Sequence, residues 1–273
     1  MSNEGRRLLR NHLKEKLSRG ETAYSMTVRL VRTVDIAAIA YTAGFDSIYI
    51  DLEHSSFSLE AAGQICIACQ SLGITPLVRV PGLDPHLIAR VMDAGAMGVI
   101  LPGVQSADEA RVAVRAVKHA PLGERSLSGA SPQLLYRTLP PEQTIDELDQ
   151  ASMVVPMIES RAGLDAADAI AAVHGVDMLL VGANDLSVEL GVAGQMDHPK
   201  VHEAYLHVID VCRAHGKATG VGGLGGRPDL VRRYLELGAN YVSTGNDISF
   251  LSAAAAQRRQ QFDSAATDQE VLG

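Results

Sequence analysis

The chain has 273 residues, of which 47% are hydrophobic and 21% are charged, and its formal net charge is −8. This length suits one large domain with a sizeable core, because α/β barrels commonly reach about 250 residues as a single unit. The negative charge argues against nucleic acid or an anionic membrane as the main partner, although a local arginine still allows an anionic substrate.

The cysteines and the apolar runs bear on the compartment. The chain has three cysteines, Cys66, Cys69 and Cys212. Such a sparse, odd set predicts reduced thiols and a cytoplasmic location. No apolar run approaches the roughly 20 residues of a membrane helix, so no membrane partner is expected. The basic N-terminus lacks the apolar stretch of a secretory signal.

The predicted elements begin with an amphipathic surface helix over residues 5–19, within an N-terminal helical segment of residues 1–22. Short apolar runs then alternate with longer amphipathic stretches. The predicted strands are 24–31, 47–51, 76–80, 98–102, 153–158, 178–181, 218–221 and 241–244. The predicted helices are 34–43, 59–72, 85–94, 107–119, 161–173, 199–215, 228–237 and 248–262. The polar tail, residues 264–273, is predicted to be disordered.

The repeated alternation predicts the fold. Several predicted helices end at a glycine that suits a left-handed C-cap, among them Gly44, Gly73 and Gly238. Eight strand–helix units predict one (β/α)8 barrel, a TIM barrel, over residues 1–273. A doubly wound sheet is the alternative, but residues 26–33 lack its phosphate-binding glycine turn. The long connection 120–150 is expected to be a functional or mobile loop.

Polar residues gather at the carboxyl ends of the predicted strands. Asp51 and His54 follow the second strand, Arg79 ends the third, Glu159 follows the fifth and Asp185 follows the sixth. These strand ends meet on one face of a barrel, where barrel active sites are built. The five side chains therefore predict one active site.

Two of these acids suit a hard cation. Glu159 and Asp185 have no neighbouring His or Cys ligand motif, and oxygen ligands of this kind favour Mg²⁺ or Mn²⁺. The alternative is that each acid is a helix N-cap or an ordinary loop residue.

The remaining polar residues suit proton transfer and anion binding. His54 beside Asp51 predicts a base oriented by a carboxylate, with a loop histidine bonded to backbone as the alternative. Arg79 ends an apolar strand and needs a partner, which is either Glu53 or a substrate oxygen.

Two motifs are misleading. Cys66 and Cys69 match C-x-x-C inside an apolar helical stretch, which predicts buried core thiols. Residues 220–225 match G-x-G-x-x-G, but at the seventh unit and without the expected acid, so this segment is predicted to be the loop after strand seven, able to contact phosphate or substrate.

Seven short stretches together resemble the HpcH/HpaI aldolase family of metal-dependent pyruvate aldolases. They are Ala-Gly-Phe-Asp at 43–46, Asp-Leu-Glu-His at 51–54, Val-Arg-Val-Pro at 78–81, Met-Asp-Ala-Gly at 92–95, Ile-Glu-Ser at 158–160, Gly-Ala-Asn-Asp-Leu-Ser at 182–187 and Tyr-Leu-Glu-Leu-Gly-Ala at 234–239. The resemblance covers about residues 24–262. It implies a barrel of the phosphoenolpyruvate/pyruvate-domain type.

The resemblance implies an aldolase that cleaves or forms 4-hydroxy-2-oxo acids through a metal-stabilised pyruvate enolate. Glu159 and Asp185 would bind Mg²⁺, Mn²⁺ or Co²⁺, which chelates the carboxylate and keto oxygens of pyruvate. Arg79 would hold the keto or enolate oxygen, and the His54–Asp51 pair would move the hydroxyl proton. The partners would be pyruvate or a related 2-oxo acid and an aldehyde, in aromatic or sugar acid catabolism.

Further roles are implied for the substrate cradle and for the assembly. The backbone of Gly182, Ala183 and Asn184 would cradle the pyruvyl carboxylate, and Asp93 would reach the site of a neighbouring subunit. The family is typically hexameric, a trimer of dimers with an exchanged terminal helix.

The chain also departs from the family pattern. Met157 replaces a glutamine two residues before the metal-binding glutamate, and Val28 replaces a strand-one aromatic. Our hypothesis is that Arg29, Arg32 or Arg125 contacts a distal polar or carboxylate group of the substrate. Two alternatives to an aldolase are related enolate chemistry with another electrophile, as in acyl-CoA, citrate-synthase or citramalyl-lyase-like reactions, and a non-catalytic binding barrel.

Overall fold

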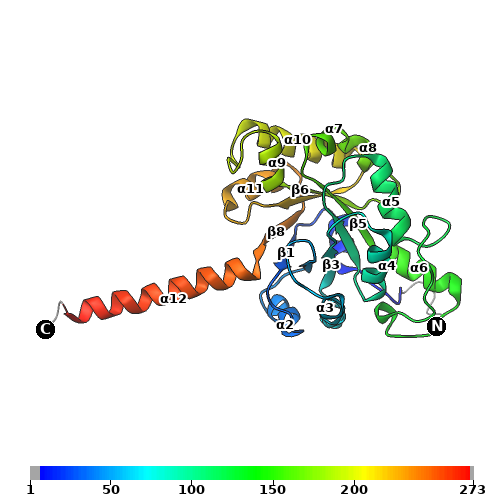
Figure 1. Cartoon of the computed structure of the whole chain (residues 1–273), viewed down its shortest axis with the longest axis horizontal. Coiled ribbons are helices and arrows are strands. Elements are labelled where there is room, and N and C mark those ends of the chain that lie inside the picture. The colour runs from blue at the N-terminus through cyan, green and yellow to red at the C-terminus, as the bar shows by residue number, and fades with distance from the viewer. Residues whose placement is uncertain (1–6, 271–273) are drawn as a thin grey trace.

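The computed structural model describes residues 7–270, and eight parallel strands close into a barrel in chain order. The predicted TIM barrel is therefore confirmed (Figure 1). The strands are β1 Ala23–Val28, β2 Ser47–Asp51, β3 Thr75–Arg79, β4 Gly98–Leu101, β5 Met153–Ile158, β6 Met178–Gly182, β7 Ala218–Gly222 and β8 Tyr241–Asn246. The helices are α1 His12–Ser18, α2 Asp35–Thr42, α3 Leu59–Ser71, α4 Pro85–Asp93, α5 Ala107–Val117, η1 Pro132–Leu134, α6 Pro141–Ala151, α7 Arg161–Asp165, α8 Ala167–Ala171, α9 Ala183–Glu189, α10 Pro199–Ala214, α11 Pro228–Leu237 and α12 Asp247–Glu270.

The core has two principal layers. One lies between the strands and the surrounding helices, and it includes both Cys66 and Cys69. The other fills the barrel interior, where Leu13 and Leu17 of α1 join strand residues such as Tyr241. Helix α1 therefore plugs the amino-terminal end of the barrel, which leaves the carboxyl end for a site.

Local sequence explains where the helices begin and end. The side chains of Ser58, Asp84 and Ser106 each accept a backbone N–H in the first turn of the helix that follows, as N-caps do. Gly238 ends α11 with a φ of 116°, which only glycine adopts readily.

The connection 120–150 is more ordered than expected. Its first part has little regular structure, but its second part forms α6, which starts with Pro141 and buries Leu148 and Ala151. The expectation of one continuous loop was wrong because the proline-rich start concealed this apolar face. The predicted helix 161–173 is broken into α7 and α8, and α9 was not predicted because seven residues carry too weak a period.

Both ends of the chain differ from expectation. Helix α1 begins at His12 rather than residue 5, because Asn11 caps its first turn. The predicted disordered tail, 264–273, differs as well: α12 continues to Glu270, while residues 271–273 lie outside the described residues. The sequence from Asp247 to Glu270 has no glycine or proline and is rich in alanine, glutamine and arginine, which favour helix.

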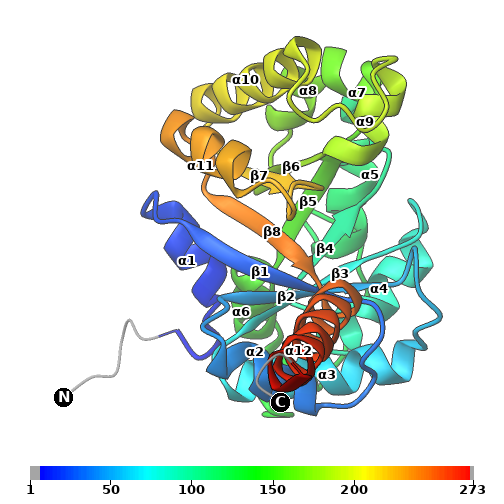
Figure 2. The same cartoon turned by 90° about the vertical axis from the view of Figure 1, so that its left-hand side faces the viewer.

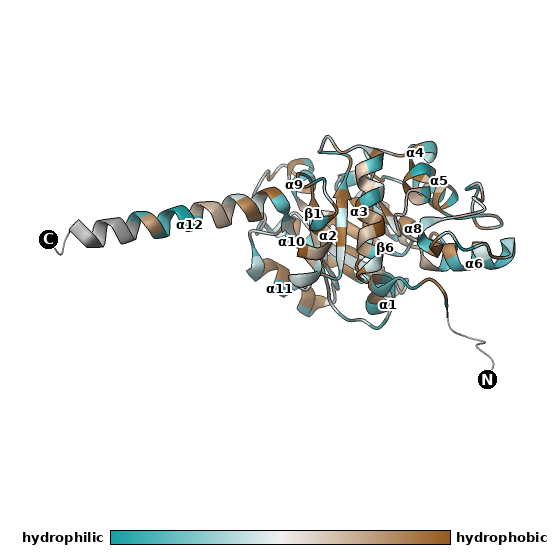
Figure 3. Ribbon diagram, turned by 90° about the horizontal axis from the view of Figure 1, so that it is seen from below, coloured by the Kyte–Doolittle hydropathy of each residue, from teal (hydrophilic) through white to brown (hydrophobic). Residues whose placement is uncertain are grey.

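Helix α12 projects from the barrel as a single helix (Figure 1, Figure 3). It starts at the carboxyl ends of β8 and β1, which lie side by side (Figure 2). None of the helices in the described part of the chain is long and apolar enough to cross a membrane.

Candidate active site

A cavity of about 520 Å³ opens at the carboxyl end of the barrel. It contains most of the residues predicted from the sequence. Its acidic, basic and histidine lining residues are Arg29, Asp51, His54, Arg79, Glu159 and Asp185. The strand ends meet there as expected for a barrel.

Arg79 and Asp51 form a buried, two-pronged ion pair on neighbouring strands. Asp51 on β2 lies opposite Arg79 on β3 in the register. The Nε of Arg79 donates to Oδ1 of Asp51 at 3.0 Å and its Nη2 donates to Oδ2 at 2.6 Å. Nη1 of Arg79 lies 3.0 Å from Oε2 of Glu53. The predicted Arg79–Glu53 ion pair is thus present, and Asp51 is an additional partner.

This pairing sets the charge state of both groups. Burial would raise the pKa of Asp51, but the hydrogen bonds from Arg79 and from the backbone of His54 and Glu53 hold that pKa below its usual range. Burial would likewise lower the pKa of Arg79, but the carboxylates around it raise that pKa. Both groups are therefore charged at neutral pH.

The predicted pairing of the His54 ring with Asp51 is wrong in its geometry. Asp51 Oδ1 accepts a hydrogen bond from the backbone N–H of His54 at 3.2 Å, and both carboxylate oxygens accept hydrogen bonds from Arg79. The ring Nε2 of His54 lies instead 3.7 Å from Glu53 Oε2. His54 still lines the cavity and its side chain is 51% exposed, so it is accessible to a substrate.

Glu159 and Asp185 lie close together on the cavity wall. Oε1 of Glu159 accepts the backbone N–H of Gly103 at 2.6 Å. Burial raises the pKa of Glu159, and the charge of Asp185 raises it further. Their two carboxylates therefore repel each other when both are ionised.

Gly182 has no side chain and so leaves room for the carboxylate of Glu159. A Cβ on Gly182 would lie 2.7 Å from Oε2 of Glu159, so a larger residue would displace the carboxylate. Ala183 and Asn184 also line the cavity, at the start of α9. Across residues 7–270, no group of three or more His, Cys, Asp or Glu side chains is placed to hold a metal ion.

Two predicted residues lie elsewhere. Asp93 is an exposed residue at the end of α4 and does not line the cavity. Val28 points into the core between strands and helices, whereas its neighbours Thr27 and Arg29 line the cavity. Alternation along a strand explains this difference.

The structure separates the three candidate arginines. Arg29 lines the cavity. Arg32 contacts Ser56 and lies over the ring of Phe57, 5.9 Å from its centroid, outside the cavity. Arg125 is buried elsewhere and donates to His119.

Several lining residues were missed by sequence reasoning. They come from β1, β8 and the start of α12 and are Thr27, Ser243, Thr244, Asn246, Ser249, Phe250 and Ala253. They are small polar or apolar residues without charge, so no chemical pattern distinguishes them in a sequence. Their position becomes visible only when β8 pairs with β1.

The first misleading motif behaves as predicted, and the second does so in part. Cys66 and Cys69 are buried thiols, and burial raises the pKa of each. The predicted loop 220–225 is correct only in its second half, because β7 extends to Gly222; Gly222 at the end of β7 and Gly223 and Gly225 in the loop after it line the cavity.

The chain is similar to known proteins over most of its length. The sequence pattern of the family described as HpcH/HpaI aldolase/citrate lyase matches residues 30–254. The chain is 43% identical over 216 residues to 4-hydroxy-4-methyl-2-oxoglutarate aldolase tasA of Hapsidospora irregularis, covering 78% of this chain and 80% of that one. It is 33% identical over 220 residues to 5-keto-4-deoxy-D-glucarate aldolase of Escherichia coli (strain K12), covering 81% and 84%.

The fold is matched by solved structures as well. The crystal structure of an HpcH/HpaI aldolase from Desulfitobacterium hafniense DCB-2 superposes with a TM-score of 0.87 at 31% identity, covering 93% of this chain and 97% of that one. The expectation of an aldolase-type lyase is confirmed at the level of the family. The chain belongs to the HpcH/HpaI aldolase/citrate lyase family.

Proposed function

We propose that the protein is a divalent-metal-dependent aldolase that cleaves or forms 4-hydroxy-2-oxo acids through the enolate of pyruvate or a close analogue. The observation that carries this proposal is the pair of adjacent carboxylates, Glu159 and Asp185, in one cavity with Arg79 and His54. The compound in the name of the fungal relative, 4-hydroxy-4-methyl-2-oxoglutarate, is itself a 4-hydroxy-2-oxo acid.

The residues fit a divalent cation. Three carboxylates and two guanidinium groups line the cavity, and Asp51 is already neutralised by Arg79. Glu159 and Asp185 would therefore repel an anionic 2-oxo acid unless a cation lay between them and the substrate. Two oxygen ligands that leave positions for water and substrate suit Mg²⁺, Mn²⁺ or Co²⁺. A divalent cation bound there would supply Lewis-acid stabilisation of the charge that develops on the keto oxygen.

Residues of the chain would bind the oxygen atoms of the substrate. Arg79 is fixed by Asp51 and Glu53 and presents its positive charge to the cavity, where it would bind the keto or enolate oxygen. The backbone at Gly182 to Asn184 would receive the pyruvyl carboxylate.

His54 would take the proton from the substrate hydroxyl during cleavage and return it during synthesis. Its ring lies beside Glu53, so we assign the orienting carboxylate to Glu53. Asp51 then has a positioning role, because it holds Arg79 and the backbone N–H groups of Glu53 and His54.

Exchange of the pyruvate methyl protons tests the proposal directly. The protein is incubated with pyruvate and Mg²⁺ or Mn²⁺ in D₂O, and the methyl signal is followed by NMR. We expect exchange that EDTA abolishes and that Glu159→Gln lacks. No exchange with pyruvate, oxaloacetate or hydroxypyruvate would reject an enolate-forming site and favour a binding barrel.

A second measurement addresses the electrophile. We expect release of pyruvate from 4-hydroxy-2-oxo acids. Metal-dependent exchange without any such cleavage would instead favour related chemistry with an acyl thioester or another electrophile.

A further inference from the structure

The cavity has two chemically different ends. One end holds Glu159, Asp185 and Gly182 from β5 and β6 and the segments that follow them. The other end is formed by β1, β8 and the first turns of α12, and it contains Arg29. The function proposed above uses the first end for the pyruvyl group, so the second end faces the remainder of the substrate.

We propose that Arg29 binds a carboxylate at the distal end of the substrate, so that the preferred substrates are 4-hydroxy-2-oxo acids with two carboxylates. This inference rests on the proposed aldolase function. It concerns binding of the group attached to the hydroxyl-bearing carbon and adds no chemical step.

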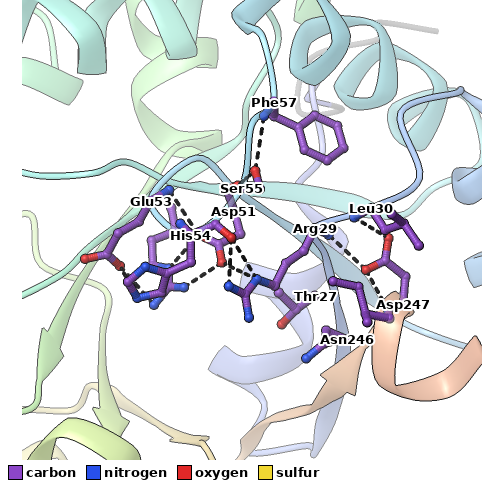
Figure 4. A network of polar contacts seen from close by, with 12 residues as sticks. Thr27, Arg29, Leu30, Asp51, Glu53, His54, Ser55, Phe57, Asn246 and Asp247 are labelled. Atoms are coloured by element: carbon purple, nitrogen blue, oxygen red, sulfur yellow. Dashed lines mark hydrogen bonds and ion pairs between the residues drawn. The ribbon is translucent and has the colours of Figure 1, made fainter. Parts of the chain in front are cut away.

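Arg29 is held in place yet keeps free donors. Its Nε lies 3.2 Å from Oδ2 of Asp51, and its Nη2 donates to the backbone carbonyl of His54 at 2.7 Å. Among residues 7–263 its Nη1 has no hydrogen-bond or ion-pair partner. Figure 4 shows these contacts of Arg29. A guanidinium group has five N–H donors, and a fixed group with open donors binds a carboxylate at low entropic cost.

Arg29 is not required to neutralise Asp51. Both oxygens of Asp51 already accept from Arg79, and Oδ1 also accepts two backbone N–H groups. The side chain of Arg29 is 32% exposed, whereas that of Asp51 is fully buried. A partly exposed guanidinium with a spare face is suited to a ligand more than to a structural pair.

Asp247 does not compete with a ligand for the side chain of Arg29. Asp247, the nearest acid on α12, points its carboxylate at the backbone N–H groups of Arg29, Leu30 and Val31 at 2.8 to 3.0 Å (Figure 4). Asp247 thereby fixes the backbone from which the Arg29 side chain extends. Its negative charge is directed at the backbone and does not oppose an incoming carboxylate.

The other residues at this end suit the rest of such a substrate. The hydroxyl groups of Thr27 and Ser243 lie 3.1 Å apart, and Asn246 is opposite Thr27 in the pairing of β1 with β8. Neutral hydrogen-bonding side chains therefore line the same end of the cavity as Arg29. Phe250 and Ala253 add a small apolar wall. A carboxylate with a small neighbouring alkyl or hydrogen substituent matches this combination.

Two matched substrates test the inference. 4-Hydroxy-2-oxopentanedioate carries the distal carboxylate, and 4-hydroxy-2-oxopentanoate has a methyl group in its place. For Arg29→Gln we expect kcat/KM for the first to fall about 10- to 100-fold, as expected for loss of hydrogen bonds to a charged group. We expect kcat/KM for the second to change less than about threefold, because the lost donors have no partner in that substrate. Arg29→Lys should recover part of the loss, because it keeps the charge.

The controls separate the possible failures. Arg32→Gln removes a neighbouring arginine that does not line the cavity, and it should leave both substrates unaffected. An equal loss on both substrates in Arg29→Gln would assign Arg29 to positioning of the His54 loop, and no loss on either would leave it without a role; both results overturn the inference.

Pyruvate methyl exchange in D₂O distinguishes this inference from the function on which it rests. Exchange needs only the pyruvyl end of the cavity. If the wild-type protein shows no exchange, the aldolase proposal itself fails. If Arg29→Gln exchanges normally and its substrate preference is unchanged, only the distal-carboxylate inference fails.

Discussion

At the scale of single residues, neighbours decide what each acid does. Asp51 and Asp185 are the same residue type; Asp51 ends one apolar barrel strand and Asp185 follows another. Asp51 meets Arg79 and becomes a buried anion with a lowered pKa. Asp185 instead lies near Glu159, whose pKa is raised by burial and by that charge. The first arrangement positions an arginine, and the second suits the divalent cation that we propose.

Glu159→Gln should abolish stabilisation by divalent metal. A ligand that binds only the folded state stabilises it by about 2.7 kcal/mol at a concentration 100 times its Kd. We therefore expect Mg²⁺ or Mn²⁺ to raise the Tm of the wild-type protein but not that of the variant, as measured by calorimetry. Glu189→Gln, at the exposed end of α9, is the matched control and should keep the shift.

Without metal, the charge of Glu159 affects the stability of the folded protein. Because the pKa of Glu159 is raised on folding, the stability linked to its protonated form is present below the ordinary value of 4.5 and is lost as the pH rises through the raised pKa. At neutral pH the metal-free variant should thus be no less stable than the wild type. If Mg²⁺ or Mn²⁺ raised the Tm of the wild type and of Glu159→Gln equally, Glu159 would not be a metal ligand.

At the scale of elements, the junction of α5 and α6 depends on one buried lysine. Lys118 follows α5, and its Nζ donates to the carbonyls of Asp149 and Ser152 and to the hydroxyl of Ser152 at the end of α6. Burial lowers its pKa to about 8. These hydrogen bonds hold the end of α6 against the residue that follows α5, in the segment where the sequence predicted only a loop.

Lys118→Met should destabilise the fold by about 2–3 kcal/mol at neutral pH, because it leaves buried acceptors without donors. The wild-type protein should gain stability as the pH rises from about 8 toward 10.5, since the unfolded chain then binds the proton more strongly than the folded one. The variant should lack that gain. Urea unfolding across this pH range measures both effects.

Lys16→Met serves as the comparison. Lys16 forms a partly exposed ion pair with Asp46, so its removal should cost only a fraction of that amount. Lys118 would not be the residue that holds α6 in place if Lys118→Met and Lys16→Met lowered the free energy of unfolding equally. The same conclusion would follow if the wild type showed no gain in stability above pH 8.

At the scale of the whole molecule, α12 stands apart from the barrel. Beyond its first turns it projects outward (Figure 3). Leu251, in its second turn, is 60% exposed, and Phe262, further along the helix, is 67% exposed. An isolated helix is marginally stable in water, so packing against another surface would stabilise it. The family resemblance implies exchange of a terminal helix between subunits, and this remains a prediction for the present chain.

Replacing Leu251 and Phe262 together with glutamate should lower the oligomeric mass measured by light scattering, because charges would enter an apolar interface. The barrel should stay folded by circular dichroism, since neither side chain belongs to its core. Gln257→Glu adds charge to the same helix without removing an apolar group, and it should leave the mass unchanged. An unchanged mass in the double variant as well would show that α12 does not carry an interface.

Most of the barrel could be predicted because its signals are local. The strands 47–51 and 153–158 and the helix 228–237 agree with β2, β5 and α11 at both ends, since each is a continuous apolar or amphipathic run with clear boundaries. Helices α6 and α9 were missed because proline-rich flanks hid one and shortness hid the other.

The candidate site could be predicted only in part. The sequence by itself determined that acids, a histidine and an arginine follow or end apolar strands, and this placed five side chains, Asp51, His54, Arg79, Glu159 and Asp185, at one end of a barrel. Tertiary structure alone decided which of them pair. Asp51 meets Arg79 through the register of β2 with β3, and Arg29 joins the cavity through closure of β8 against β1. Partners so distant along the chain leave no local pattern, because their contact depends on how the whole barrel closes.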